Sequence, residues 1–313
     1  MSSPGVSRGS CFGFAVDSSV PLLDLREPAT DLPALTIREA DADAAAATPG
    51  GAPIAEWAAS PTVPWPGRLH RSGSGWDLRV DGAGWFRIDP RAGVITVPPT
   101  TDPLRREERL WSVPAILCLL ARGDLPLHAA AVEIDGQAVI LAGPRGSGKS
   151  TLAAGLIRAG HRLLSEDVVG LRPGTHEILP GPAMIRLRHD VAAWLDVPGA
   201  TVAGHVDDRV HLVLDAESRA DGAARPVAGI VVLAESGTGD PGMPIDATSA
   251  VAALWPLASQ MPGRDGVAQR FELVVDVARA VPAFRLASDA GPAGLASTVA
   301  AVEGLARALS RSS

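Results

Sequence analysis

One glycine-rich segment of the chain has the residue types and the spacing of a phosphate-binding loop. Residues 143–151 read Gly-Pro-Arg-Gly-Ser-Gly-Lys-Ser-Thr, which matches the Walker A pattern G-x-x-x-x-G-K-[ST] without a mismatch. In such a P-loop, backbone N–H groups contact phosphate oxygens, the lysine reaches the β- and γ-phosphates, and the serine hydroxyl binds Mg²⁺. The predicted nucleotide-binding residues are Gly143, Arg145, Gly146, Ser147, Gly148, Lys149, Ser150 and Thr151.

Lys149 is the only lysine in the chain, although Lys and Arg together number 28 among its 313 residues. The guanidinium of arginine is a planar fork, whereas the lysine ammonium is a compact charge with rotatable donors, so the two groups do not contact phosphate in the same way. All the remaining residues in this Lys and Arg count are arginine, so lysine occurs only in this motif. This favours nucleotide binding over a glycine-rich turn that matches the pattern by chance.

The segments on both sides of the loop have the order that the motif requires. Residues 138–142 form an apolar run that predicts a short buried strand. Residues 150–159 carry apolar side chains at helical spacing, and Gly160 is a suitable helix stop. Because strand, loop and helix follow one another, the N-terminus of the helix is predicted to add positive potential at the phosphates.

Two adjacent acidic residues, Glu166 and Asp167, lie within a predicted strand over residues 162–171. Phosphoryl transfer needs a phosphate site, a metal, and a carboxylate that orients or deprotonates the attacking hydroxyl. One of the two carboxylates is therefore assigned to the metal and the other to the base. Neighbouring residues on a strand point to opposite faces, so the strand must bend or end there if both reach the site. A pair of solvated turn carboxylates is the alternative.

Four basic or titratable residues are weaker candidates. His128 precedes a predicted strand and could approach the same strand ends, although a lone histidine is more often structural. Arg186 and Arg188 flank Leu187 and share a face if that segment is a strand. They could bind phosphates or an acidic substrate, or simply lie on the surface. Arg209 is a weaker substrate-binding candidate.

Composition and charge exclude several classes of protein. The formal net charge of −7 argues against nonspecific binding to nucleic acids or acidic membranes. Cys11 and Cys118 are too few and too distant in sequence to predict a metal site or a disulfide framework. No apolar stretch reaches the roughly 18 residues of a membrane span, and the first residues lack signal-peptide features, so we predict a cytoplasmic protein. The chain has no Asn, which excludes the Asn-Lys-x-Asp motif of GTPases.

The first part of the chain, residues 1–115, is predicted to be a β-rich domain. Turn signals separate its short strand-like segments, and residues 41–53 resemble a surface linker. Four of the seven tryptophans, Trp57, Trp65, Trp76 and Trp85, occur here and favour a domain core over a ligand-binding face. The predicted elements are strands over 10–16, 35–38, 76–80, 85–88 and 93–97, and a bridging helix over 104–122.

The second part, residues 116–313, has an α/β pattern. Asp135-Gly136 is a strong hairpin signal between predicted strands over 129–134 and 138–141. The other predicted elements are strands over 162–171, 184–187, 206–214, 228–234 and 283–287, and helices over 150–159, 189–195, 246–259, 266–279 and 292–310. Asp207-Asp208 is interpreted as a turn rather than a metal site.

Three segments together resemble HPr kinase/phosphorylase: residues 127–136, the P-loop, and residues 160–167. They are still more similar to HPr-kinase-related serine kinases from peptide-natural-product clusters, including lasso-peptide tailoring kinases. The resemblance is specific over about residues 120–175. It implies a P-loop kinase fold shared with phosphoenolpyruvate carboxykinase, the use of ATP with Mg²⁺, and transfer of the γ-phosphate to a serine hydroxyl.

The resemblance also implies roles for individual residues. Gly143, Gly148, Lys149, Ser150 and Thr151 match the nucleotide loop of the family, and His128 matches a histidine before the loop hairpin. Glu166 and Asp167 match a pair that is usually Asp-Asp, whose first member is the base. By this assignment Glu166 is the base, while Asp167 and Ser150 position Mg²⁺. The chain departs from the family because it lacks the basic signature that binds HPr and has an unrelated N-terminal third.

The predicted function is therefore an ATP-dependent kinase, a transferase that modifies a serine hydroxyl of a peptide or protein. Its catalytic residues are Glu166, Asp167, His128 and Lys149. A kinase of a small hydroxylated metabolite and a non-catalytic nucleotide-binding regulator are the two rivals. A motor-type ATPase is a weaker alternative. Such enzymes have a long apolar strand that ends in Asp-Glu, and residues 230–235 come nearest to that pattern in this chain. The resemblance leaves open whether the chain forms a homo-oligomer.

Overall fold

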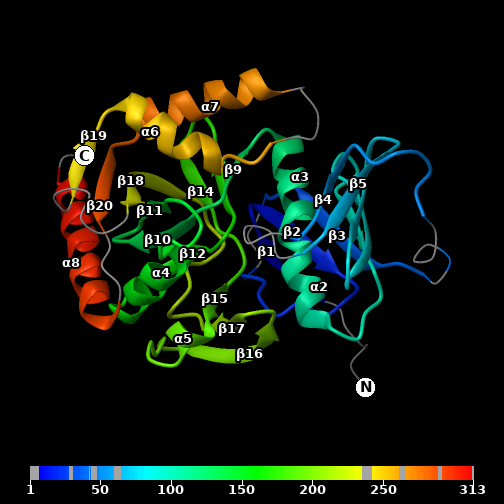
Figure 1. Cartoon of the computed structure of the whole chain (residues 1–313), viewed down its shortest axis with the longest axis horizontal. Helices are drawn as coiled ribbons and strands as arrows, with labels where there is room; N and C mark the ends of the chain where they lie inside the picture. Colours follow the sequence, from blue (N-terminus) through cyan, green and yellow to red (C-terminus); the bar gives the residue numbers. More distant parts are fainter. Residues whose placement is uncertain are drawn as a thin grey trace.

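Two large β-sheets frame the molecule, and helices α2 (Pro103–Leu110) and α3 (Val113–Arg122) lie between them (Figure 1). A third, smaller sheet lies below the larger core sheet in this view. The computed structural model describes residues 7–27, 31–41, 43, 48–59, 65–234, 242–260, 266–287 and 291–311. The molecule is thus a mixed α/β protein with several sheets.

The first sheet has eight strands in the order β1-β2-β3-β8-β7-β6-β5-β4. Strand β3 pairs in parallel with both β2 and β8, and the other neighbours pair antiparallel. Trp65, Trp76 and Trp85 are buried, and Trp57 packs on the same core, as expected for a β-rich unit. The strands are β1 (Ser7–Cys11), β2 (Phe14–Ser18), β3 (Ala34–Glu39), β4 (Ala55–Trp57), β5 (Gly67–Ser72), β6 (Gly75–Val80), β7 (Gly84–Asp89) and β8 (Val94–Val97).

Two predicted elements in this region are each divided in the structure. The predicted strand over 10–16 is the hairpin β1–β2, which reverses at Phe12-Gly13, where φ is 51° and 66°. The predicted helix over 104–122 is interrupted at residues 111–112, so α2 and α3 are separate. Pro114 lies in the first turn of α3, because proline has no N–H and its ring clashes with the preceding turn of a continuous helix. The predicted linker at 41–53 lies partly outside the described residues.

The core sheet leads into the glycine-rich segment at residues 143–148, and its main path has the order β12-β10-β11-β18-β14-β13-β9. The hairpin predicted at Asp135-Gly136 is confirmed: both residues have positive φ and join β10 to β11. Strand β11 then pairs in parallel with β18, which pairs in parallel with β20. The strands are β9 (Leu125–Leu127), β10 (Ala130–Ile134), β11 (Gln137–Ala142), β12 (Arg162–Ser165), β13 (Val169–Arg172), β14 (Glu177–Leu179), β18 (Arg225–Ala234), β19 (Met243–Ile245) and β20 (Ala283–Ala287).

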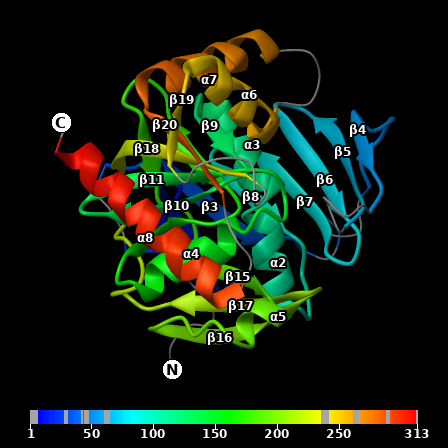
Figure 2. The same cartoon turned by 60° about the vertical axis from the view of Figure 1, so that its left-hand side comes forward.

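Helices cover both faces of the core sheet because its central strands are apolar on both sides (Figure 2). In β11, Val139 and Leu141 belong to the cluster that includes α4 (Lys149–Arg158) and α8 (Gly291–Ser310). Ile140 faces the opposite cluster, which includes α6 (Ala247–Leu254) and α7 (Val267–Ala280). A 3-10 turn, Trp255–Leu257, extends α6. Within the described part of the chain, no helix is long and apolar enough to cross a membrane.

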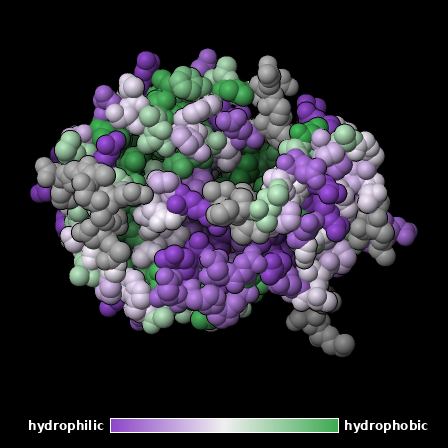
Figure 3. Space-filling model, viewed as in Figure 1, coloured by the Kyte–Doolittle hydropathy of each residue, from purple (hydrophilic) through white to green (hydrophobic). Residues whose placement is uncertain are grey.

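The small sheet has the order β15-β17-β16 and packs beneath α4. Its strands are β15 (Met184–Arg188), β16 (Ala200–Val206) and β17 (Arg209–Leu214), and the short helix α5 (His189–Ala192) follows β15. The strand predicted over 206–214 is therefore the turn and second arm of a hairpin, with Asp207 at positive φ in the turn. The helix predicted over 189–195 ends early, at Ala192. Hydrophilic residues gather over this sheet and the neighbouring end of α2 (Figure 3).

Arg26 connects the N-terminal part of the chain to the core. It is 1% exposed, and burial lowers the pKa of its guanidinium to about 10. The guanidinium donates hydrogen bonds to four main-chain carbonyl oxygens, those of Gly181, Ala220, Leu163 and Leu164. Two of these carbonyls belong to β12, so Arg26 holds the strand that leads into Glu166 and Asp167.

Replacing Arg26 by methionine is expected to lower the free energy of unfolding by about 3 kcal/mol or more, because several buried carbonyl groups lose their donor. Urea denaturation of the variant measures this loss. Arg8→Met is the matched control, since the Arg8 side chain is 73% exposed and pairs with a surface aspartate. Equal denaturation midpoints for the two variants would contradict the structural role of Arg26.

Candidate functional site

The glycine-rich segment that the sequence predicts to be a P-loop lies between β11 and α4, and its glycines have backbone angles that favour glycine. Gly146 and Gly148 have φ of 85° and 90°, in the left-handed region that favours glycine. At Gly143, a Cβ atom would lie 2.8 Å from Ser147 Oγ and 3.0 Å from the carbonyl oxygen of Leu233. The hydroxyl of Ser147 is buried and has no hydrogen-bond partner among the described residues. A phosphate oxygen would satisfy such a donor.

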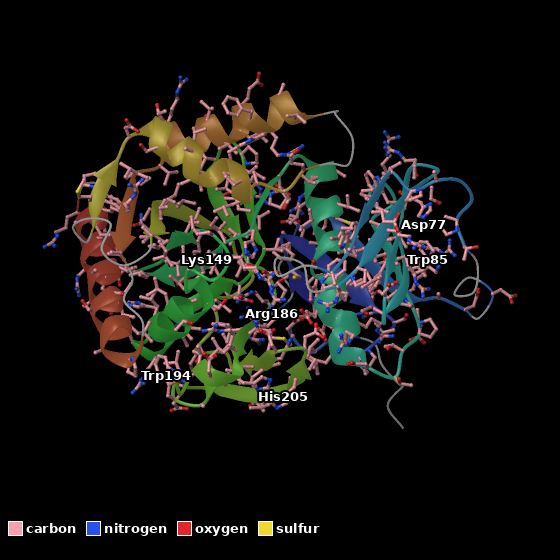
Figure 4. The ribbon with its side chains drawn as sticks, viewed as in Figure 1. Asp77, Trp85, Lys149, Arg186, Trp194 and His205 are labelled. Atoms are coloured by element: carbon pink, nitrogen blue, oxygen red, sulfur yellow. The ribbon has the colours of Figure 1, made fainter. Side chains whose placement is uncertain are left out.

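Lys149 is placed inside this loop and is only 7% exposed (Figure 4). Its Nζ donates hydrogen bonds to the carbonyl oxygens of Gly143, at 2.9 Å, and Pro144, at 3.0 Å. Burial lowers the pKa of this ammonium, and the nearby charges of Asp167 and Glu166 partly offset the effect. Neither hydrogen-bond acceptor carries a charge, so an anion such as phosphate would be a suitable additional partner.

Glu166 and Asp167 lie at the point where β12 ends. The strand predicted over 162–171 is divided into β12 and β13 here, and Asp167 has a φ of 68°. This break allows both carboxylates to reach the same site, which a continuous strand would not. The Ser150 hydroxyl donates a hydrogen bond to Glu166 Oε1 at 2.5 Å. The Glu166 side chain is 7% exposed and that of Asp167 is 33% exposed, so Asp167 is the more accessible acid.

His128 lies beside Asp167. Its Nδ1 atom is 3.2 Å from Asp167 Oδ1 and 3.1 Å from the carbonyl oxygen of Asp167. Burial opposes ionisation of Asp167, but Arg186 and His128 outweigh it and hold the pKa of this carboxyl well below its ordinary value. Asp167 is therefore ionised at neutral pH and can accept a hydrogen bond.

Of the three arginines considered from the sequence, Arg186 is the one that enters the site. Its Nε is 2.9 Å from Glu166 Oε2 and its Nη2 is 2.9 Å from Asp167 Oδ2, so it bridges the two acids. Arg188 pairs with Asp190 on the surface, and Arg209 pairs with the adjacent Asp208. The reason is that β15 ends at Arg188, where the chain turns into the exposed start of α5.

Glu108 is a site residue that the sequence did not indicate. Its Oε1 lies 3.2 Å from Arg186 Nη1, although it belongs to α2 in the N-terminal part of the chain. No sequence signal separates it from its charged neighbours in the run Arg-Arg-Glu-Glu-Arg. A small cavity of about 30 Å³ adjoins the two acids, and its lining includes Phe12, Asp24, Glu108, Trp111, Met184 and Arg186.

The site has oxygen ligands suited to Mg²⁺ in Ser150, Glu166 and Asp167. Mg²⁺ usually binds to one or two protein carboxylates together with substrate phosphates and water, so a complete protein cage is not required. In the described part of the chain, this site included, no group of three or more His, Cys, Asp or Glu residues could hold a metal ion. Asp207 forms a turn and pairs with arginines, and Glu235, the acidic end of residues 230–235, lies outside the described residues.

Both cysteines are buried free thiols, and neither lines the cavity beside the two acids. Burial is the main cause that raises the pKa of Cys11 well above its ordinary value and that of Cys118 to about 12. Thiols with raised pKa values are poor nucleophiles at neutral pH because the thiolate is scarce. Neither cysteine is assigned a role in the site.

His211 is fully buried below the site, where burial, with Arg186 and Arg109, lowers its pKa to about 4. The unfolded chain binds a proton at about pH 6.5 and the folded one only near pH 4, so stability falls as the pH drops between these values. Because of this difference in the pKa of His211, we expect the free energy of unfolding to be about 2 to 3 kcal/mol lower at pH 4.5 than at pH 7.5. Urea titrations of wild type and His211→Gln at both pH values measure this, and parallel losses in the two proteins would contradict it.

Comparisons with known proteins identify one set of relatives, although no family model matches the chain. The HPr kinase/phosphorylase of Lactobacillus acidophilus is 34% identical over 119 residues, which cover 36% of this chain and 37% of that protein. The enzyme of the same name from Alkaliphilus metalliredigens is 32% identical over 99 residues, covering 30% of this chain and 32% of that protein. The chain therefore spans about a third of the length of these curated relatives.

A structural comparison matches the Hpr(Ser) kinase/phosphatase from Coxiella burnetii with a TM-score of 0.32 and 14% sequence identity, covering 58% of this chain and 94% of that one. This structural likeness is too low to support an argument. The sequence matches are the stronger finding, and they agree with the resemblance carried by the loop and the acidic pair. Over about a third of its length, the chain is thus a sequence relative of the HPr kinase/phosphorylases.

Proposed function

We propose that this protein is an ATP-dependent kinase that transfers the γ-phosphate to a serine hydroxyl of a peptide or protein. The observation that carries the proposal is the contact of Ser150 in the P-loop with Glu166, at 2.5 Å, with Asp167 as its accessible neighbour. A phosphate site, a metal site and an acceptor-orienting acid are then adjacent, as phosphoryl transfer requires. The similarity to HPr kinase/phosphorylases supports the reaction class.

ATP is proposed to bind along residues 143–151, with its phosphates against the N-terminus of α4 and the ammonium of Lys149. The unpartnered hydroxyl of Ser147 would donate to a phosphate oxygen. Ser150 and the acidic pair would hold Mg²⁺, which neutralises phosphate charge when bound. Arg186 already contacts both acids, so it can balance their charge and fix their orientation.

The contacts favour a division of roles between the two acids that reverses the family-based assignment. Glu166 accepts the hydrogen bond from Ser150 and is nearly buried, so we assign it to Mg²⁺. Both acids line the small cavity, but Asp167 is more exposed and lies against His128, so we assign it to the acceptor hydroxyl. Because its pKa is low, Asp167 orients the hydroxyl by accepting a hydrogen bond and takes the proton only as the phosphoryl group transfers.

We further propose that residues 1–115 recognise the acceptor and residues 116–313 form the kinase unit. The first sheet lies entirely within residues 7–97, whereas the P-loop, His128 and both acids lie in or beside the core sheet. The cavity beside Asp167 is lined from both parts, by Phe12 and Glu108 on one side and Met184 on the other. An acceptor that approaches Asp167 would therefore contact the N-terminal part.

A test offers the purified protein labelled ATP and Mg²⁺ with two sets of acceptors, serine-containing peptides and free hydroxylated metabolites. We expect label on peptide serine, located by mass spectrometry. Label found only on a small molecule would favour a metabolite kinase. Tight ATP binding without transfer or hydrolysis for any acceptor would indicate a non-catalytic regulator and overturn the proposed function.

A further inference from the structure

We propose that Glu108 of helix α2 is a positioning residue of the phosphotransfer site. It fixes the guanidinium of Arg186 and, through it, the carboxylates of Glu166 and Asp167. This inference rests on the proposed kinase function and extends it, because it makes a helix outside the P-loop core part of the catalytic arrangement. The acid at residue 108 does not contact the nucleotide loop in the structure and acts through Arg186 alone.

The contacts of Arg186 carry the first step. Its Nε contacts Glu166 and its Nη2 contacts Asp167, both at 2.9 Å, while Nη1 contacts Glu108 at 3.2 Å. One nitrogen is thus assigned to each carboxylate. A guanidinium is planar and rigid, so contacts on all three nitrogens fix its position and its plane. Without Glu108, the third nitrogen loses its anionic partner, and the guanidinium can tilt about the contacts to the two acids.

Glu108 is itself held in place by a series of ion pairs that connects it to the small sheet. Its Oε1 also lies 2.9 Å from Arg109 Nη1, and Arg109 Nη2 lies 3.0 Å from Asp207 Oδ2. Arg105 contacts the other oxygen of Asp207 at 2.9 Å. Asp207 is in the turn between β16 and β17, and β17 pairs directly with β15, the strand that carries Arg186. Helix α2 and the small sheet therefore hold Arg186 jointly.

The second carboxylate oxygen of Glu108 shows that this arrangement is not optimised for stability. Oε2 is buried and has no hydrogen-bond partner among the described residues, and His211 Nε2 lies 3.8 Å from it. His211 is predominantly neutral at pH 7 because its pKa is about 4. A buried carboxylate oxygen without a donor costs stability. Arg186 and Arg109 both contact Oε1, so Glu108 orients two guanidiniums while its Oε2 lacks a hydrogen-bond donor among the described residues.

The test compares Glu108→Gln with Glu39→Gln as the matched control. Glu39 lies at the end of β3 and is half-exposed. It pairs at 2.6 Å with Arg106 of α2, the helix that also carries Glu108, rather than with Arg186. We expect Glu108→Gln to lower kcat for phosphotransfer about 10- to 100-fold while KM for ATP stays within about threefold, because a misoriented acid affects the reaction more than nucleotide binding. Glu108→Asp, which keeps the charge, is expected to recover part of the rate. The control is expected to match wild type.

A second readout does not depend on activity. Arginine side chains are modified by phenylglyoxal, and peptide mass spectrometry measures the rate at Arg186 in each folded variant. Arg186 is 19% exposed and held by three acids, so we expect slow modification in wild type and in Glu39→Gln, and at least threefold faster modification in Glu108→Gln. Melting curves confirm that each variant is folded at the assay temperature.

The outcomes separate the two proposals. Unchanged kcat and unchanged Arg186 reactivity in Glu108→Gln would overturn the positioning role and leave the kinase function standing. A wild-type protein that transfers phosphate to no acceptor would overturn the proposed function. The rate at which phenylglyoxal modifies Arg186 would then test the contact with Glu108 without an activity measurement. If Glu108→Gln unfolds at the assay temperature, Glu108→Asp is compared instead. Its shorter side chain is expected to recover only part of the rate, so wild-type kcat together with wild-type reactivity at Arg186 in that variant counts against the proposal.

Discussion

Replacing Lys149 by alanine is expected to abolish phosphotransfer while the fold is retained. The ammonium is 7% exposed and donates hydrogen bonds to two uncharged carbonyl oxygens of its own loop. One contact between an ammonium and a phosphate near 4 Å is worth on the order of 4 kcal/mol at an effective dielectric of about 20. A loss of that size corresponds to about a thousandfold decrease in rate. Transfer of label from ATP to the acceptor measures it.

Lys149→Arg is the informative companion to this variant. It keeps the charge but replaces a compact ammonium by a wider planar group within a loop whose Gly143 already has no room for a Cβ. We expect it to be nearly as inactive as Lys149→Ala. Circular dichroism and melting temperature of both variants are expected to remain close to wild type. Phosphotransfer at the wild-type rate in the alanine variant would contradict the nucleotide site.

Asp167→Asn is expected to have the second largest effect. Asparagine tolerates the left-handed backbone at this residue, where φ is 68°, so the change removes the charge without straining the turn. Because the ionised carboxylate is the group assigned to the acceptor hydroxyl, we expect kcat to fall about 10²- to 10⁴-fold, with KM for ATP little changed. Steady-state kinetics with varied ATP and varied acceptor separate the two parameters.

Glu166→Gln is the matched variant that distinguishes the roles of the two acids. Glu166 accepts from Ser150, so its loss is expected to raise the Mg²⁺ concentration needed for half-maximal rate more than Asp167→Asn does. The opposite pattern, with a raised Mg²⁺ requirement only in Asp167→Asn, would restore the assignment implied by the family resemblance. A melting temperature for each variant accounts for the lost partner of Arg186.

Asp167→Asn and Glu166→Gln change an acidic pair whose position depends on contacts between distant parts of the chain. Arg26 binds the carbonyl oxygens at the end of β12, directly before the acids, and Glu108 binds the arginine that bridges them. The N-terminal part therefore contacts the site through a buried arginine and through helix α2. A change in how this part packs would reach Glu166 and Asp167 without altering the P-loop.

Local pattern in the sequence was sufficient to predict the elements around the proposed nucleotide site. The P-loop spacing, the apolar strand before it and the Asp135-Gly136 turn are determined by residues close to one another in the chain, and the structure has each of them. The alternation of Val139 and Leu141 with Ile140 likewise follows from the two-residue period of a strand between two apolar layers. Such features depend on backbone sterics and side-chain period, which are readable from sequence.

Where segments end, and which side chains meet, was decided by tertiary structure. The breaks at Phe12-Gly13, at residues 111–112 and at Glu166-Asp167 divide elements that the sequence predicts to be continuous, and positive φ at Phe12, Gly13 and Asp167 marks two of these turns. Arg186 and Arg188 are equivalent by pattern, yet only Arg186 has carboxylates from β12 and α2 within reach. Glu108 lies 58 and 59 residues before the acids it helps to orient, and only the folded chain brings a charge across that separation to a contact distance.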